Sequence, residues 1–117
     1  MAKLPRMQKM KDGLYKVVFD SNVNPNGQCD GIVSIRDNRI NGGDYVCFYR
    51  GLIQSGGVTL QVVRHNPNDT TVFNGVNNVE LALQVKEIGE GAIFNGSVWS
   101  RPDLTISGSL TFLSELI

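Results

Sequence analysis

The stretch Leu104-Thr105-Ile106-Ser107-Gly108-Ser109-Leu110-Thr111-Phe112 decides the fold class of this chain. Large apolar side chains alternate in it with small polar ones. A period of two residues places the two kinds on opposite faces of a β-strand, whereas a helical period of 3.6 residues would scatter them around the helix. The stretch therefore predicts a strand with one apolar and one polar face.

The same alternation recurs through the rest of the chain in short segments, at 14–20, 31–36, 45–53, 58–62, 79–86 and 92–99. Residues typical of turns separate these segments: Asn24–Gly27, Arg36–Arg39, Gly42–Asp44, Ser55–Gly57, Gly89–Gly91 and Arg101–Asp103. No insert long enough for a crossover helix lies between them, so consecutive strands are expected to pair antiparallel.

We therefore predict an all-β, antiparallel up-and-down meander of about eight strands closed into a barrel. A stacked sandwich is the alternative, because it also hides one apolar face of each sheet. Closure is favoured because up-and-down order closes without Greek-key crossings and leaves no exposed strand edge.

Length and composition indicate one folded domain. The chain has 117 residues, 41% of them hydrophobic and 19% charged. We expect residues 10–117 to form the barrel and residues 1–9, which carry Lys3, Arg6 and Lys9, to be a flexible extension. Because these first residues lack the apolar core of a secretion signal, and no apolar run reaches membrane-spanning length, a cytoplasmic location without membrane contact is predicted.

No residue pattern indicates catalysis, a metal site or a cofactor. His65 is the single histidine, so neither a Ser-His-Asp triad nor a histidine-rich metal cluster is expected. Cys29 and Cys47 are either buried reduced thiols or, as the alternative, a disulfide across neighbouring strands. Eleven basic residues balance eleven acidic ones, which disfavours direct nucleic-acid binding. We therefore expect a protein that is not an enzyme.

Six aromatic residues fall on the predicted inward faces: Tyr15, Phe19, Tyr45, Tyr49, Phe94 and Phe112. They form either a packed core or the lining of a shallow apolar cavity, with Arg64 or His65 as a polar group at its rim. On the opposite face of the predicted strand 45–53, Val46, Phe48 and Leu52 form a candidate dimer patch.

Several motifs keep a characteristic order along the chain: Met10–Tyr15, Gly42–Asp44, Tyr49–Gly51, Phe94–Gly96, Arg101–Leu104 and Leu110-Thr111. In this order and spacing the sequence resembles the GrlR-like family, small β-barrel proteins named for a negative regulator of type III secretion genes. The resemblance implies a lipocalin-like barrel with a shallow apolar cavity, found in the cytoplasm as a homodimer. It also implies regulation of transcription by binding an activator protein instead of DNA.

The resemblance assigns the activator contact to an acidic run in the turn before Val58. This chain has Ser55, Gly56 and Gly57 there, so these are its candidate partner-binding residues, and the acidic charge is absent. The sequence thus predicts a non-enzymatic regulatory module that acts by protein–protein contact. The alternative is a carrier or sensor of a small apolar ligand.

Overall fold

A computed structural model describes residues 10–54, 57–68 and 78–117, with residues 24–28 described by their backbone alone. The predicted extension, residues 1–9, lies outside the described residues. The strands are β1 (Gly13–Ser21), β2 (Asn24–Arg36), β3 (Arg39–Gly43), β4 (Cys47–Gln54), β5 (Gly57–Arg64), β6 (Asn78–Ile88), β7 (Gly91–Val98) and β8 (Arg101–Ser114). No helix of the described residues is long and apolar enough to cross a membrane.

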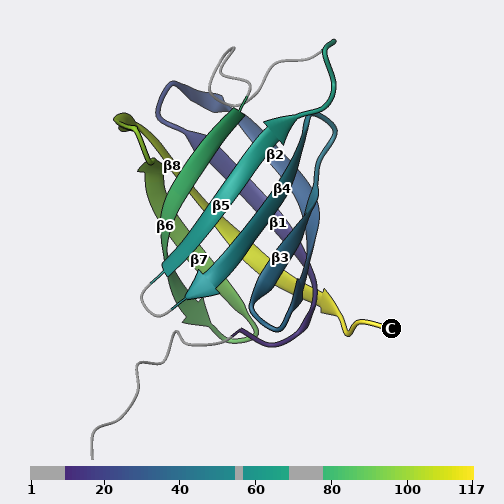
Figure 1. The fold of residues 1–117 in the computed structure, drawn as a ribbon. Helices are drawn as coiled ribbons and strands as arrows, with labels where there is room; N and C mark the ends of the chain where they lie inside the picture. The colour runs from purple at the N-terminus through teal and green to yellow at the C-terminus, as the bar shows by residue number, and fades with distance from the viewer. Residues whose placement is uncertain (1–9, 55–56, 69–77) are drawn as a thin grey trace, which may run out of the picture.

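The eight strands form a closed barrel in sequence order, with β8 returning to pair with β1 (Figure 1). All neighbouring strands are antiparallel, including the closing pair, in which Val17 lies opposite Leu110. The predicted meander barrel is confirmed, and the sandwich alternative is wrong. Closure pairs the two strands that would otherwise be sheet edges, which a sandwich would leave open.

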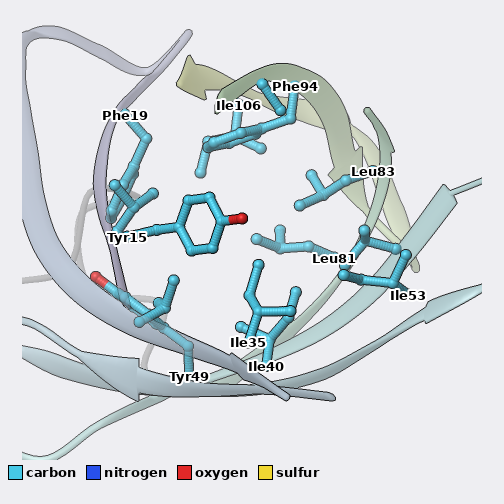
Figure 2. Packing of buried hydrophobic residues seen from close by; sticks show 14 of the residues in the cluster. Tyr15, Phe19, Ile35, Ile40, Tyr49, Ile53, Leu81, Leu83, Phe94 and Ile106 are labelled. Atoms are coloured by element: carbon cyan, nitrogen blue, oxygen red, sulfur yellow. The ribbon is translucent and has the colours of Figure 1, made fainter. Parts of the chain in front are cut away.

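The alternation of side chains gives the barrel its apolar interior. On β1, Tyr15, Val17 and Phe19 are buried, whereas the intervening Lys16 is exposed. Tyr15, Ile35 and Leu81 are the largest fully buried side chains. Figure 2 shows these three, from different strands, pointing toward the middle of the barrel. The interior is therefore built by one face of every strand.

We call the end of the barrel where β1 begins the base, and the opposite end the rim. Met10 is buried at the base, with 3% of its surface exposed. The Tyr15 hydroxyl donates a hydrogen bond to the Lys11 carbonyl at 2.7 Å. Lys11 Nζ lies 3.4 Å from Glu90 Oε2 and 4.2 Å from the centre of the Phe112 ring. These contacts hold the chain before β1 across the base.

Two predicted turns are in the wrong place. Asn24–Gly27 begins β2 instead of forming a turn, and Ser21 pairs with Asn24 across Asn22-Val23. Arg101–Asp103 begins β8, because Val98 pairs with Arg101 across Trp99-Ser100. Both stretches contain a proline, which a sheet accepts in the first residues of a strand. Local turn propensity was therefore overridden by strand pairing.

The predicted corner at Gly42–Asp44 is displaced by two residues. Gly42 and Gly43 belong to β3, and β4 starts only at Cys47. A Cβ on Gly42 would lie 2.1 Å from the carbonyl oxygen of Ile32, so the close approach of β2 and β3 requires glycine there. The corner itself consists of Asp44, Tyr45 and Val46.

Candidate functional site

The barrel interior contains an apolar cavity of about 60 Å³. Its walls come from all eight strands and include Val33, Tyr49, Val62, Leu81, Phe94 and Leu110. Ligand pockets commonly measure roughly 300–1,000 Å³, so this cavity is several times too small for a drug-sized ligand. Side chains therefore fill most of the interior in this structure.

The predicted inward aromatics mostly pack on one another. Tyr15, Phe19, Tyr49 and Phe94 are buried, and Phe112 is half-buried. The rings of Tyr15 and Phe112 meet edge to face with centroids 5.4 Å apart, and those of Phe19 and Tyr49 do so at 6.0 Å. Such pairs stabilise a core beyond their buried area. Their geometry favours core packing over a lined cavity.

Tyr45 does not face inward, and its assignment to the cavity is wrong. Its side chain is 74% exposed in the corner between β3 and β4. The Asp44 carboxylate holds Tyr45 in a turn, because its Oδ1 accepts hydrogen bonds from the backbone amides of Val46 and Cys47, both at 2.7 Å. An aspartate bonded to the backbone two and three residues ahead stabilises a turn. The alternation of β4 therefore starts two residues later than predicted.

A polar cluster at the rim is centred on Asp44. The hydroxyl of Tyr49 donates a hydrogen bond to Asp44 Oδ2. The Nε2 of His65 lies 2.9 Å from the Asp44 carbonyl oxygen, and the backbone amide of His65 donates to the Val46 carbonyl at 2.8 Å. The cluster joins the corner before β4 to the chain that leaves β5.

Arg64 and His65 do lie at the rim, but the side chain of each is hydrogen-bonded to nearby backbone oxygens. Arg64 ends β5, and its guanidinium donates to the carbonyls of Asn66 at 2.9 Å and Pro67 at 2.6 Å. His65 is exposed and bonds the corner through its ring. These bonds position the chain after β5 and do not aim either side chain at the apolar cavity.

Both cysteines are free thiols, so the disulfide alternative does not apply to this structure. Burial is the main reason that the pKa of Cys47 rises from 9.0 to about 11, and the nearby Asp44 carboxylate and Cys29 raise it further. Arg64 opposes this shift. Because the thiolate is the reactive form, Cys47 is a poor nucleophile at neutral pH.

The outer side of β4 presents two exposed apolar side chains, Phe48 and Leu52, with exposed fractions of 39% and 45%. Val46, the third residue of the predicted dimer patch, is partly buried and packs against the core, so its assignment to that patch is wrong. It lies in the corner, where the strand alternation does not extend. Arg50 lies between Phe48 and Leu52 and is also exposed.

Sequence reasoning missed the arginines that strand pairing gathers beside this strip. Arg36 is paired with Arg39, which in turn is paired with Leu52. Arg39, Arg50 and Leu52 line a shallow outer groove of about 680 Å³ over β3 to β6. Only the register between strands brings these residues together, and the linear sequence carries no signal for it.

Only one residue of the candidate partner-binding turn, Ser55–Gly57, lies within the described residues. Ser55 and Gly56 lie outside the described residues, and Gly57 is the half-buried first residue of β5, paired with Gln54. Among residues 10–54, 57–68 and 78–117, no group of three or more His, Cys, Asp or Glu side chains is placed to hold a metal ion.

No family model matches this chain, and no curated protein matches it.

Proposed function

We propose that this protein is a non-enzymatic binding module that acts by protein–protein contact, as a negative regulator of transcription resembling the GrlR-like proteins. The observation that carries the proposal is the contrast between interior and exterior. The interior is packed with apolar side chains around a cavity of about 60 Å³, whereas charged and exposed aromatic groups lie outside. The outer surface is thus the part available for recognition.

The exterior carries residue types that are enriched at protein interfaces. Phe48 and Leu52 are exposed next to Arg50, and Trp99 and Tyr45 are 73% and 74% exposed at the rim. The few residues that dominate binding energy at protein–protein contacts are enriched in Trp, Tyr and Arg. Burial of the exposed part of these apolar side chains in a partner would also be favourable.

The proposed partner is a transcriptional activator, and the proposed location is the cytoplasm. A chain with eleven basic and eleven acidic residues has no net attraction for nucleic acid, so regulation would act through the activator instead of DNA. A homodimer remains a prediction. Phe48 and Leu52 cannot contact a second copy and a partner protein at once, so a homodimer through these two side chains would compete with partner binding.

The test combines capture and regulation in the native host. The full chain, tagged and expressed at its own level, is cross-linked and purified, and transcription is compared between wild-type and deletion strains. We expect one enriched activator and increased transcription of its target genes in the deletion strain. Failure to enrich a specific protein, together with unchanged transcription, would contradict the proposal. Light scattering measures the oligomeric state separately.

A second candidate function, a carrier of a small apolar ligand, is favoured by one observation. The interior cavity is bordered by apolar side chains such as Val62, Leu83 and Phe94. A ligand would have to be small or to displace core side chains, since the cavity measures about 60 Å³. Native mass spectrometry of protein purified from its host tests this candidate. A stoichiometric apolar adduct supports it, and a mass equal to that of the bare chain excludes it.

A further inference from the structure

We propose that the outer face of β2 to β4 is a docking surface for an acidic, amphipathic segment of a partner protein. We call it the arginine face and define it by Arg36, Arg39, Phe48, Arg50 and Leu52. The proposal rests on the proposed function of protein–protein contact, because it assigns that contact to one surface and one partner chemistry.

The register of three strands assembles the arginine face. Arg36 and Arg39 are direct cross-strand partners, and Arg39 is the partner of Leu52 on the next strand. Arg50 is paired with Asn41 and lies two residues from Leu52 on β4. Diagonal neighbours in a sheet are about 7–8 Å apart, so Arg39 and Arg50 flank Leu52 within reach of one bound segment. Arg39, Arg50 and Leu52 line the shallow groove of about 680 Å³.

Arg39 and Arg50 form no ion pair within the described part of the barrel. The ion pairs there join Lys11 to Glu90 and Arg101 to Asp103, and they include none of the three arginines. Arg36 donates a 3.4 Å hydrogen bond to the backbone oxygen of Ile117, the last residue of the sequence, so the charge assigned to a partner here is that of Arg39 and Arg50. Directly opposed like charges destabilise a sheet, so the Arg36–Arg39 pair has a cost that a bound anion would remove.

Three acidic side chains lie near the face. Asp37 is in the turn between Arg36 and Arg39, and Asp12 Oδ1 accepts a 3.0 Å hydrogen bond from the Asp37 amide. Glu80 lies on β6 at the far side of the groove, opposite Gln61. The β3–β4 side of the groove is thus cationic. An acidic segment would lie over the β3–β4 side of the groove, with its carboxylates away from Glu80.

The apolar residues decide between a protein partner and a nucleic acid. Phe48 and Leu52 are exposed on the same strand as Arg50, on either side of it. Single-stranded nucleic acid is bound by a basic groove that carries several aromatic side chains for base stacking. This face has one exposed ring, Phe48, and the aliphatic Leu52 beside its arginines, which matches carboxylates alternating with apolar side chains. Arginine also forms bidentate bonds with carboxylates. The partner chemistry is therefore acidic and amphipathic.

A peptide titration tests the chemistry. Isotope-labelled protein is titrated with a short peptide of alternating Glu and Leu, with the same peptide carrying Lys for Glu, and with a single-stranded DNA oligonucleotide. We expect only the acidic peptide to shift the amides of β2 to β4, with affinity that falls as salt rises. The double variant Arg39→Glu/Arg50→Glu should weaken it about tenfold or more, whereas Lys86→Glu, exposed on β6, should not.

Three outcomes would overturn the inference. The acidic peptide could shift amides only on other strands, the double variant could bind it as wild type does, or the oligonucleotide could bind the face more tightly than the peptide. Amide dispersion of the double variant checks its fold. If that dispersion is lost, the milder Arg39→Gln/Arg50→Gln variant replaces it and carries the same expectation of weakened binding.

Site-specific photo-cross-linking in the host separates this inference from the proposed function. Benzoylphenylalanine is placed at Phe48 or, as a control, at Ile93, which is 46% exposed on β7. We expect a protein partner to cross-link at Phe48 and not at Ile93, and to be lost with the Arg39→Glu/Arg50→Glu substitutions. A partner that cross-links only at Ile93 would overturn the arginine face and keep the proposed function. No cross-linked or captured partner would overturn both.

Discussion

Replacing Asp44 with alanine should loosen the rim more than any other single change in the corner between β3 and β4. Its carboxylate accepts hydrogen bonds from the amides of Val46 and Cys47 at 2.7 Å and from the Tyr49 hydroxyl. Alanine leaves these three donors without their acceptor. Cys47 and Tyr49 are buried, so water replaces the lost bonds only in part.

The expected loss follows from the number and kind of these bonds. A hydrogen bond to a charged group contributes about 1.5–3 kcal/mol, and the partial exposure of the corner lowers the value for each bond. We expect Asp44→Ala to reduce the free energy of unfolding by about 2–4 kcal/mol. For a chain of this size that corresponds to a melting temperature lower by roughly 8–16 °C.

Urea unfolding and two matched variants check the argument. Asp44→Asn keeps an oxygen for the amides of Val46 and Cys47, so it should lose about 1 kcal/mol. Tyr49→Phe removes only the hydroxyl and should lose a similar amount. Ordinary surface substitutions change the free energy of unfolding by less than about 0.5 kcal/mol. A change that small for Asp44→Ala, or equal losses for Asp44→Asn and Asp44→Ala, would refute the role given to the carboxylate.

Three further predictions address the interior, the thiol and the surface. Leu81 is buried and lines the interior cavity, so Leu81→Ala should lower the free energy of unfolding by about 2.5–5 kcal/mol and enlarge the cavity. Benzene should then raise the melting temperature of the variant but not of wild type, and equal responses would contradict this. Because the pKa of Cys47 is raised from 9.0 to about 11, the folded state keeps a proton that the unfolded state releases between these values. Stability measured by urea unfolding should therefore fall as pH rises from 9.0 to about 11, and less steeply in Cys47→Ala; parallel curves would rule this out. Asp103→Ala removes the exposed ion pair with Arg101 and should change the unfolding midpoint little, so a large loss would show that this pair matters more than exposure allows.

The barrel was predictable from the sequence because its main determinant is local. Strand alternation, as in Leu104–Phe112, is set by neighbouring residues and is the same wherever the strand pairs. The turns were less predictable. Asn24–Gly27 has strong turn propensity, yet the turn forms at Asn22, whose side chain donates to the Asp103 carbonyl at 2.8 Å and accepts from the Thr105 amide at 2.9 Å. That choice depends on residues about eighty positions away in the chain.

The error at Tyr45 has a different physical origin. Cys47 and Tyr49 are buried on the inner face of β4 as predicted, and only Tyr45 lies outside the strand. Asp44 ends the extended backbone by bonding the amides ahead of it. A capping aspartate is visible in the sequence, and giving it more weight than the apolar period would have placed Tyr45 outside.

The arginine face shows where sequence reasoning stops for this fold. Arg36, Arg39 and Arg50 each look like an ordinary solvent-exposed residue at their place in the sequence, and the chain as a whole has no net charge. Their grouping depends on the register of two hairpins, and a slip of one residue between β3 and β4 would send Arg39 or its partner to the opposite face. In a closed barrel with a packed interior, recognition depends on such cross-strand groupings. The register therefore determines the candidate binding surface, while the alternation determines only the fold.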